Sequence, residues 1–186
     1  MFKVFGFYKF KKLNNLKKLK NRLENNLKDY EIRGTIIISP EGVNGTISDK
    51  KNNHLKFNKL LKKLLSIKKF NSENNSNSKF NPFHKLKIKI KKEVVPMGFK
   101  VRNYNFPKNN LNPREWNKII KKKDTVLIDA RKSFEFDVGT FKKSLNPNIE
   151  NFREFPKYLN QFKNSENIAM FCTGGIRCEK ANIYLK

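Results

Sequence analysis

The chain has 186 residues and carries 42 Lys and Arg against 16 Asp and Glu, a formal net charge of +26. That length allows one domain or two small ones. Because 37% of the residues are apolar, the chain can form a packed core, and we do not expect it to be disordered throughout. Two cysteines and two histidines exclude a disulfide scaffold and argue against a zinc cluster, so we expect no metal site. The longest aliphatic run, Ile36-Ile37-Ile38, is too short for a bilayer, and the amino terminus does not resemble a secretory signal. We expect a cytoplasmic protein without membrane contact.

A charge of this size favours a polyanionic partner, with nucleic acid first. The abundance of Lys, Asn, Ile and Phe, which AT-rich codons encode, offers a second cause for the same excess. The charge is uneven, because residues 1–95 hold 24 basic and 7 acidic residues (net +17), whereas residues 96–186 hold 18 and 9 (net +9). If the charge serves a polyanion, the first half should make most of the contact.

In the first half, strand and helix patterns alternate in the order β-α-β-β-α-β. We expect strands over residues 4–10, 32–39, 43–48 and 86–91, and leucine-faced helices over residues 13–27 and 55–67. The polar segment 71–78 is expected to be a flexible loop. This order predicts a ferredoxin-like split βαβ domain over residues 1–95, a fold that by itself names no function.

Residues 96–118 are expected to form a linker and a helix, with Asn112 as the N-cap and Pro113 at the first helical position. Buried strands are then predicted at residues 125–128 and 167–171. Helices are expected after Ser133 as a cap, over residues 152–162, and from about residue 177. Alternating strands and helices indicate a parallel sheet. The predicted fold class is α/β: an α+β first domain and an α/β second domain over residues 119–186.

One segment carries the features of a reactive site. A predicted strand ends at Cys172, Gly174 and Gly175 allow a tight turn, and a helix follows. Converging N–H groups and the positive end of the helix dipole would stabilise an anion at that point, and the closest one is the thiolate of Cys172. Arg177 adds a fixed positive charge. We therefore predict that Cys172 is a nucleophile or a persulfide carrier rather than a buried structural cysteine.

Cys178 allows two interpretations. It could resolve an oxidised or persulfidated Cys172, or it could fill space in the first turn of the helix.

These motifs resemble a rhodanese domain, and the wider chain resembles the rhodanese-related tRNA uridine hydroxylases. The resemblance is carried by Val126-Leu-Ile-Asp129-Ala-Arg131, Glu135, Gly139, Cys172-Thr-Gly-Gly-Ile-Arg177-Cys-Glu-Lys, and Ser39-Pro-Glu-Gly-Val-Asn-Gly-Thr46. It covers nearly the whole chain, with two departures. Thr140 stands where rhodanese domains usually have His, and the chain ends nine residues after Arg177, where the family continues, so the second domain is expected to be incomplete.

The resemblance implies conversion of the wobble uridine of tRNA, position 34, to 5-hydroxyuridine, with molecular oxygen as cosubstrate and no cofactor visible in the sequence. It also implies a role for each matching residue. Cys172 would be the essential cysteine, directly or as a persulfide, and the cradle of its sulfur would consist of Thr173, Gly174, Gly175, Ile176 and Arg177. Asp129 and Arg131 would brace this loop. The basic first domain would hold tRNA, whose anticodon loop presents an unstacked base.

Two other functions remain open at this point. The loop alone fits a sulfurtransferase that takes sulfur from thiosulfate or a carrier persulfide. A shortened, inactive RNA-binding protein is the third reading, and it predicts salt-sensitive tRNA binding that does not depend on Cys172.

Overall fold

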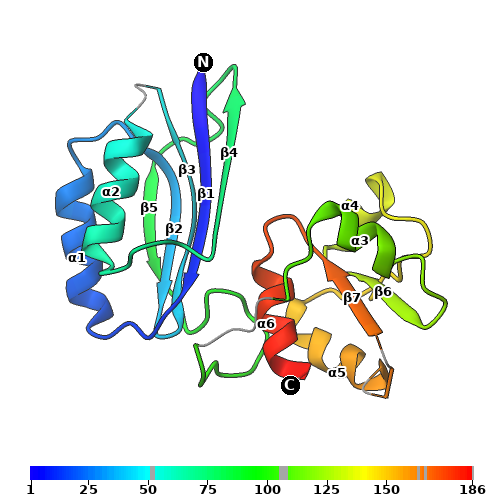
Figure 1. The fold of residues 1–186 in the computed structure, drawn as a ribbon. Helices are drawn as coiled ribbons and strands as arrows, with labels where there is room; N and C mark the ends of the chain where they lie inside the picture. Colours follow the sequence, from blue (N-terminus) through cyan, green and yellow to red (C-terminus); the bar gives the residue numbers. More distant parts are fainter. Residues whose placement is uncertain (51–52, 105–108, 163, 166, 186) are drawn as a thin grey trace. The chain divides into compact units, whose positions relative to one another are not determined.

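The chain divides after Val94 into two units, Met1–Val94 and Val95–Lys186. The structure is a computed structural model that describes residues 1–50, 53–104, 109–162, 164–165 and 167–185. Its elements form a mixed α/β fold, which confirms the predicted class (Figure 1).

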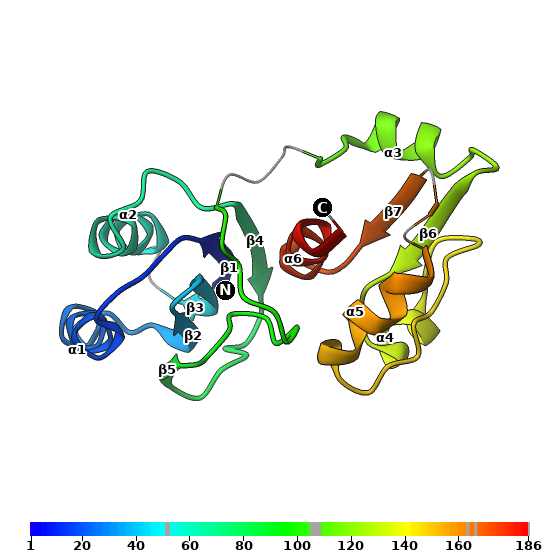
Figure 2. The ribbon, with the colours of Figure 1, turned by 90° about the horizontal axis from the view of Figure 1, so that it is seen from below.

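The first unit is a five-stranded sheet in the order β4-β1-β3-β2-β5, with both helices on one face (Figures 1 and 2). Its elements are β1 (Phe2–Phe10), α1 (Leu16–Leu27), β2 (Arg33–Ser39), β3 (Gly42–Asp49), α2 (His54–Leu64), β4 (Ser72–Ser78) and β5 (Leu86–Ile90). The strands β4, β1, β3 and β2 pair antiparallel throughout, which is the sheet of a split βαβ fold.

The expected loop over residues 71–78 is wrong. Ser72–Ser78 is β4, which pairs with β1 from Tyr8↔Ser72 to Phe2↔Ser78. β4 is an edge strand that backbone hydrogen bonds hold along one side, and most of its side chains are exposed. Because it buries little side-chain surface, polar residues can form this strand. The segment expected to be the fourth strand, Leu86–Ile90, is an additional strand that runs parallel to β2 at the opposite edge.

The core of the first unit lies between the sheet and its two helices. Alternate residues of β1, Phe5 and Phe7, meet Leu23 and Leu27 of α1 and Phe57 of α2, all at most 3% exposed. Burying a side chain of this size contributes about 1.5–3 kcal/mol. The apolar residues that recur with strand and helix periodicity in the sequence therefore form one shared core.

The second unit is built around two parallel strands, β6 and β7, in register from Thr125↔Asn167 to Asp129↔Phe171. Its elements are α3 (Pro113–Ile119), β6 (Thr125–Asp129), α4 (Ser133–Val138), η1 (Phe152–Glu154), α5 (Phe155–Leu159), η2 (Asn160–Phe162), β7 (Asn167–Phe171) and α6 (Ile176–Leu185). Buried side chains of α5 and α6, Phe155, Leu159 and Ala181, pack with Ile128 of β6. Because the strands are parallel, their carboxyl ends lie at the same edge, which places Asp129 next to the start of the Cys172 loop.

Three helical details follow from local chemistry. Asn112 caps α3 as expected, since its Oδ1 accepts from the N–H groups of Arg114 and Glu115. The cap of α4 is Lys132, not Ser133, and the Glu135 carboxylate accepts the Lys132 N–H at 3.2 Å.

Residues 152–162 form three short helical pieces instead of one helix, and Pro156, which has no N–H to donate, lies in the first turn of α5.

Candidate active site

Cys172 directly follows β7, and its sulfur is held by the turn that leads into α6. The N–H of Gly175 donates to Sγ of Cys172 at 3.1 Å. Gly175 has a φ of 86°, a left-handed conformation that side chains disfavour, so a glycine at this position lets the N–H face the sulfur. The loop thereby forms the anion-binding turn that the sequence indicates.

The surroundings of Cys172 favour its thiolate. The pKa of Cys172 is lowered from 9.0 to about 5, and the hydrogen bond from the Cys178 side chain is the largest cause. Burial acts in the opposite direction, but the backbone N–H groups of Cys178 and Arg177 and the charge of Arg177 outweigh it. At neutral pH the sulfur is an anion without the help of a histidine.

Cys178 holds the complementary proton. Its side-chain hydrogen bond to Cys172 raises the pKa of the Cys178 thiol well above 9.0, and burial adds to that rise. Both cysteines are free rather than joined in a disulfide. The pair therefore consists of one thiolate and one thiol that donates to it.

Arg177 is fixed by the loop and by β6. Its Nη1 donates to the carbonyl of Ala130 at 3.1 Å, and its Nη2 lies 3.4 Å from Oγ1 of Thr173. Glu135 of α4 completes this group: it accepts from Thr173 Oγ1 at 2.8 Å and pairs with Arg177 at 3.5 Å. Burial alone would raise the pKa of Glu135, but these bonds and the Lys132 N–H hold it below its usual value.

A second ion pair supports the site from the end of β6. Asp129 is 0% exposed, and Arg131 donates to it in bidentate fashion, from Nε at 2.9 Å and from Nη2 at 2.7 Å. Thr140 donates to the same carboxylate at 2.9 Å, while Arg131 Nη2 also reaches the carbonyl of Gly139 at 2.6 Å. Burial works against the ionised carboxylate, yet these bonds hold the pKa of Asp129 below its usual value.

The structure brings most of the predicted site residues together. Hydrogen bonds and electrostatic interactions around the sulfur link Cys172, Thr173, Gly175, Arg177 and Cys178. Gly174 lies in the same turn, and Ile176 is the first residue of α6. Asp129 and Arg131 form a pair with each other at the end of the neighbouring strand.

The sequence does not predict two residues of the site, Glu135 and Thr140. Glu135 stands in the rhodanese-like string, and this is the signal that could have identified it. Thr140 replaces the usual His, and its hydroxyl occupies a place in the Asp129 network.

Comparison with known proteins places the chain in a family. Residues 2–94 match the UPF0176 acylphosphatase-like domain. The whole chain is 60% identical to the tRNA uridine(34) hydroxylase of Pelagibacter ubique (strain HTCC1062) and covers 62% of that protein. It is 38% identical to the same-named protein of Legionella pneumophila (strain Corby), with 98% of this chain and 73% of that protein covered. The chain belongs to the tRNA uridine(34) hydroxylase family.

A third family member, from Wolbachia, is 35% identical over the full chain, which covers 69% of it. Family membership confirms the resemblance and the acylphosphatase-like first unit. The chain spans less than two thirds of the Pelagibacter hydroxylase. No helix in the described ranges is long and apolar enough to span a membrane. The same described residues contain no group of three or more His, Cys, Asp or Glu arranged to hold a metal ion.

Proposed function

We propose that the protein hydroxylates carbon 5 of the wobble uridine in tRNA, giving 5-hydroxyuridine. The observation that carries this proposal is the turn around Sγ of Cys172, where the Gly175 N–H donates at 3.1 Å and the pKa of the thiol is lowered, in a chain that belongs to the tRNA uridine(34) hydroxylase family. Molecular oxygen is the cosubstrate that a hydroxylase of this family implies. The anticodon loop presents the base, and the cytoplasm is the compartment where tRNA and reduced thiols coexist.

In this proposal the residues of the loop have separate tasks. Cys172 is the catalytic residue, directly or as a persulfide, because its sulfur is ionised at neutral pH. The Gly175 N–H and Arg177 hold the negative charge on that sulfur. Thr173 and Glu135 keep Arg177 in place, and Asp129 with Arg131 supports the adjoining turn. Cys178 stabilises the thiolate and is also placed to resolve an oxidised Cys172.

The test is the replacement Cys172→Ala in a bacterial strain that lacks its own uridine 34 hydroxylase. Complementation with the unaltered chain should restore 5-hydroxyuridine, measured by mass spectrometry of tRNA nucleosides, and the variant should restore none. Purified Cys172→Ala should still bind tRNA with nearly unchanged affinity, because the basic charge of residues 1–94 is intact. Equal 5-hydroxyuridine with both chains would contradict the proposed role of Cys172, and none with either would contradict the activity.

A second function fits the same sulfur. The Cys172 thiolate could attack the outer sulfur of thiosulfate, release sulfite and carry a persulfide, which cyanide would then remove as thiocyanate. This sulfurtransferase activity is favoured by the anion-binding turn around Sγ. A thiosulfate:cyanide assay on the purified chain distinguishes it, since turnover without any 5-hydroxyuridine formation would favour the sulfurtransferase. The remaining alternative, an inactive RNA-binding protein, predicts neither activity.

A further inference from the structure

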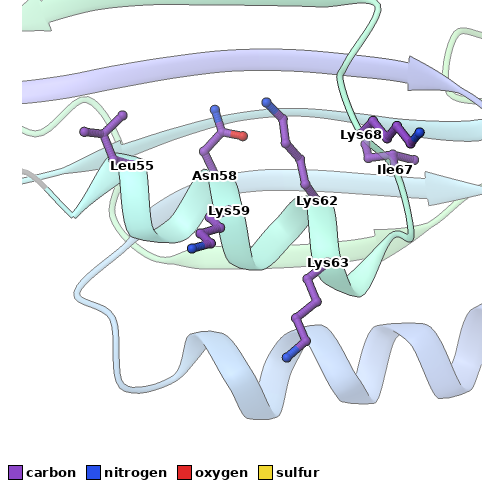
Figure 3. A pocket seen from close by; sticks show the side chains of 7 residues that line it. All are labelled: Leu55, Asn58, Lys59, Lys62, Lys63, Ile67 and Lys68. Carbon is purple, nitrogen blue, oxygen red and sulfur yellow. The ribbon is translucent and has the colours of Figure 1, made fainter.

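A shallow hollow of about 450 Å³ lies along α2 and the segment that follows it. Figure 3 shows Lys59, Lys62 and Lys63 along α2, and Lys68 on the segment beyond the helix. All four line the hollow, and it belongs entirely to the first unit, whereas the cysteine loop belongs to the second.

The charge around this hollow is one-sided. Residues 50–72 hold eight lysines and no Asp or Glu. Lys62 pairs with Glu73 at 2.6 Å. In the part of the chain that the structure describes, no carboxylate pairs with the exposed side chains of Lys59, Lys63 or Lys68. Three positive charges therefore face solvent with no paired carboxylate among the described residues.

Helix stabilisation explains only some of these lysines. Lys62 and Lys63 lie in the last turn of α2, where a positive charge offsets the helix dipole. Lys59 lies earlier in the helix and Lys68 lies beyond its end, so neither serves that purpose. Both line the same hollow, where their charges favour an anionic ligand, and in Figure 3 Lys62 and Lys63 extend to opposite sides of α2.

The other residues that line the hollow add a second requirement. Lys62 is fixed between Glu73 and the ring of Phe70, whose centroid lies 5.4 Å from Nζ, and Asn58 donates to Glu73 at 3.3 Å. The lining also includes two apolar side chains, Ile67 and Leu55, of which Leu55 is 70% exposed. A ligand that combines phosphates with a less polar sugar and base matches this lining better than a free inorganic ion.

We propose that this hollow binds consecutive phosphates of the tRNA backbone through Lys59, Lys63 and Lys68. Lysines are suited to this because an ammonium group acts as a point charge for phosphate oxygens and does not need one fixed geometry. The inference rests on the proposed function in one respect, since it takes tRNA as the source of the phosphates. It adds the location: the helix-covered side of the first unit, rather than the opposite face of its sheet.

The experiment compares two triple variants of the full chain that lose the same charge. One is Lys59→Gln, Lys63→Gln and Lys68→Gln. The control is Lys87→Gln, Lys89→Gln and Lys91→Gln, in and directly after β5; Lys87 and Lys89 pair with Thr35 and Ile37, on the sheet face away from the Ile36 and Ile38 core side chains. All six residues are exposed, so both variants should fold, which circular dichroism checks.

The measurement is the affinity for a labelled tRNA transcript across a salt series. The hollow variant should bind about tenfold more weakly near 0.15 M salt, and the slope of log K against log salt should fall by about 0.7–0.9 for each lost phosphate contact. The control should lose less than threefold. Equal losses in both variants would show a general charge effect and overturn the proposed site, and so would a larger loss in the control.

Inorganic phosphate provides a further arm. If 10 mM phosphate at constant ionic strength displaces the tRNA as well as a tenfold excess of unlabelled tRNA does, the hollow is a site for the free ion and the proposal is wrong. An unaltered chain that does not bind tRNA would contradict the proposed function itself. Loss confined to the hollow variant supports the inference whatever the hydroxylation assay shows.

Discussion

At the residue scale, the site depends on one proton shared unequally by two cysteines. Cys178 donates to Cys172, and this bond lowers the pKa of one thiol while it raises the pKa of the other. The sequence could predict a reactive Cys172 from the turn and Arg177, but it left the role of Cys178 open. The spacing of six residues does not reveal whether two sulfurs meet; only the bend at Gly174-Gly175, followed by a helical turn, brings them together.

This arrangement predicts opposite outcomes for two replacements of Cys178. Cys178→Ala removes the donor, so the pKa of Cys172 should rise by about one to two units, given that a hydrogen bond to a charged group contributes about 1.5–3 kcal/mol. Cys178→Ser keeps a hydroxyl donor and should hold the pKa low. The measurement is the rate of iodoacetamide alkylation at Cys172 against pH, followed by mass spectrometry, with a midpoint near 5 in the unaltered chain.

The same shift has a consequence for stability. Because the folded pKa of Cys172 is below its ordinary value of 9.0, the stability that its thiolate contributes is present near pH 9 and is lost as the pH falls through about 5. Above pH 9 the raised pKa of Cys178 acts in the opposite direction, because the unfolded thiol ionises there and the folded one does not.

Identical alkylation midpoints for Cys178→Ala and Cys178→Ser would show that the Cys178 side chain does not hold the thiolate.

At the element scale, the sequence predicts the helices and strands that bury apolar side chains or carry a capping motif. It does not predict β4, a strand that depends only on backbone pairing with a distant segment. β6 and β7 are short apolar runs bounded by turn residues, and the Asn112 cap with Pro113 marks the start of α3. β4 has no apolar face, since Asn74, Asn75 and Asn77 are exposed. Its strand conformation comes from β1, which is distant in sequence, so no local signal indicates it.

The turn after β6 gives the prediction that belongs to this scale. Arg131→Ala should destabilise the second unit by about 2–4 kcal/mol at pH 7, because Asp129 would remain buried without its cation. The loss should be smaller than for a fully buried pair, because the Arg131 side chain is partly exposed to solvent. Thr140→Val, the control, removes one neutral donor from the same carboxylate and should cost about 1 kcal/mol. Urea denaturation measures both.

The pH dependence of that loss supplies its check. The lowered pKa of Asp129 means that its stabilisation is present above its ordinary pKa of 3.8 and disappears as the pH falls through the folded value. The difference between the unaltered chain and Arg131→Ala should therefore shrink in acid. A difference below 1 kcal/mol at pH 7, or one that is the same at pH 7 and pH 3, would show that the pair does not support the turn.

At the scale of the whole molecule, each unit has its own apolar core. The residues of the first cluster all lie before Val94, and those of the second all follow it. At the boundary, the N–H of Val94 donates to the buried carboxylate of Glu41 at 2.9 Å, which ties the end of the first unit to the turn between β2 and β3. The sequence predicts a first domain over residues 1–95.

A fragment of residues 1–94 should therefore fold alone and unfold cooperatively in urea. Salt near 0.15 M is needed, because a net charge of +17, from 24 basic and 7 acidic residues, opposes a folded state of this size. The matched fragment, residues 1–84, lacks β5 and loses the cover that Ile88 gives to Ile36 and Ile38. It should be less stable by at least about 2–3 kcal/mol, the contribution of one buried side chain of this size with its strand pairing. A fragment of residues 1–94 without a cooperative transition, or two fragments of equal stability, would show that the first unit does not hold its own core.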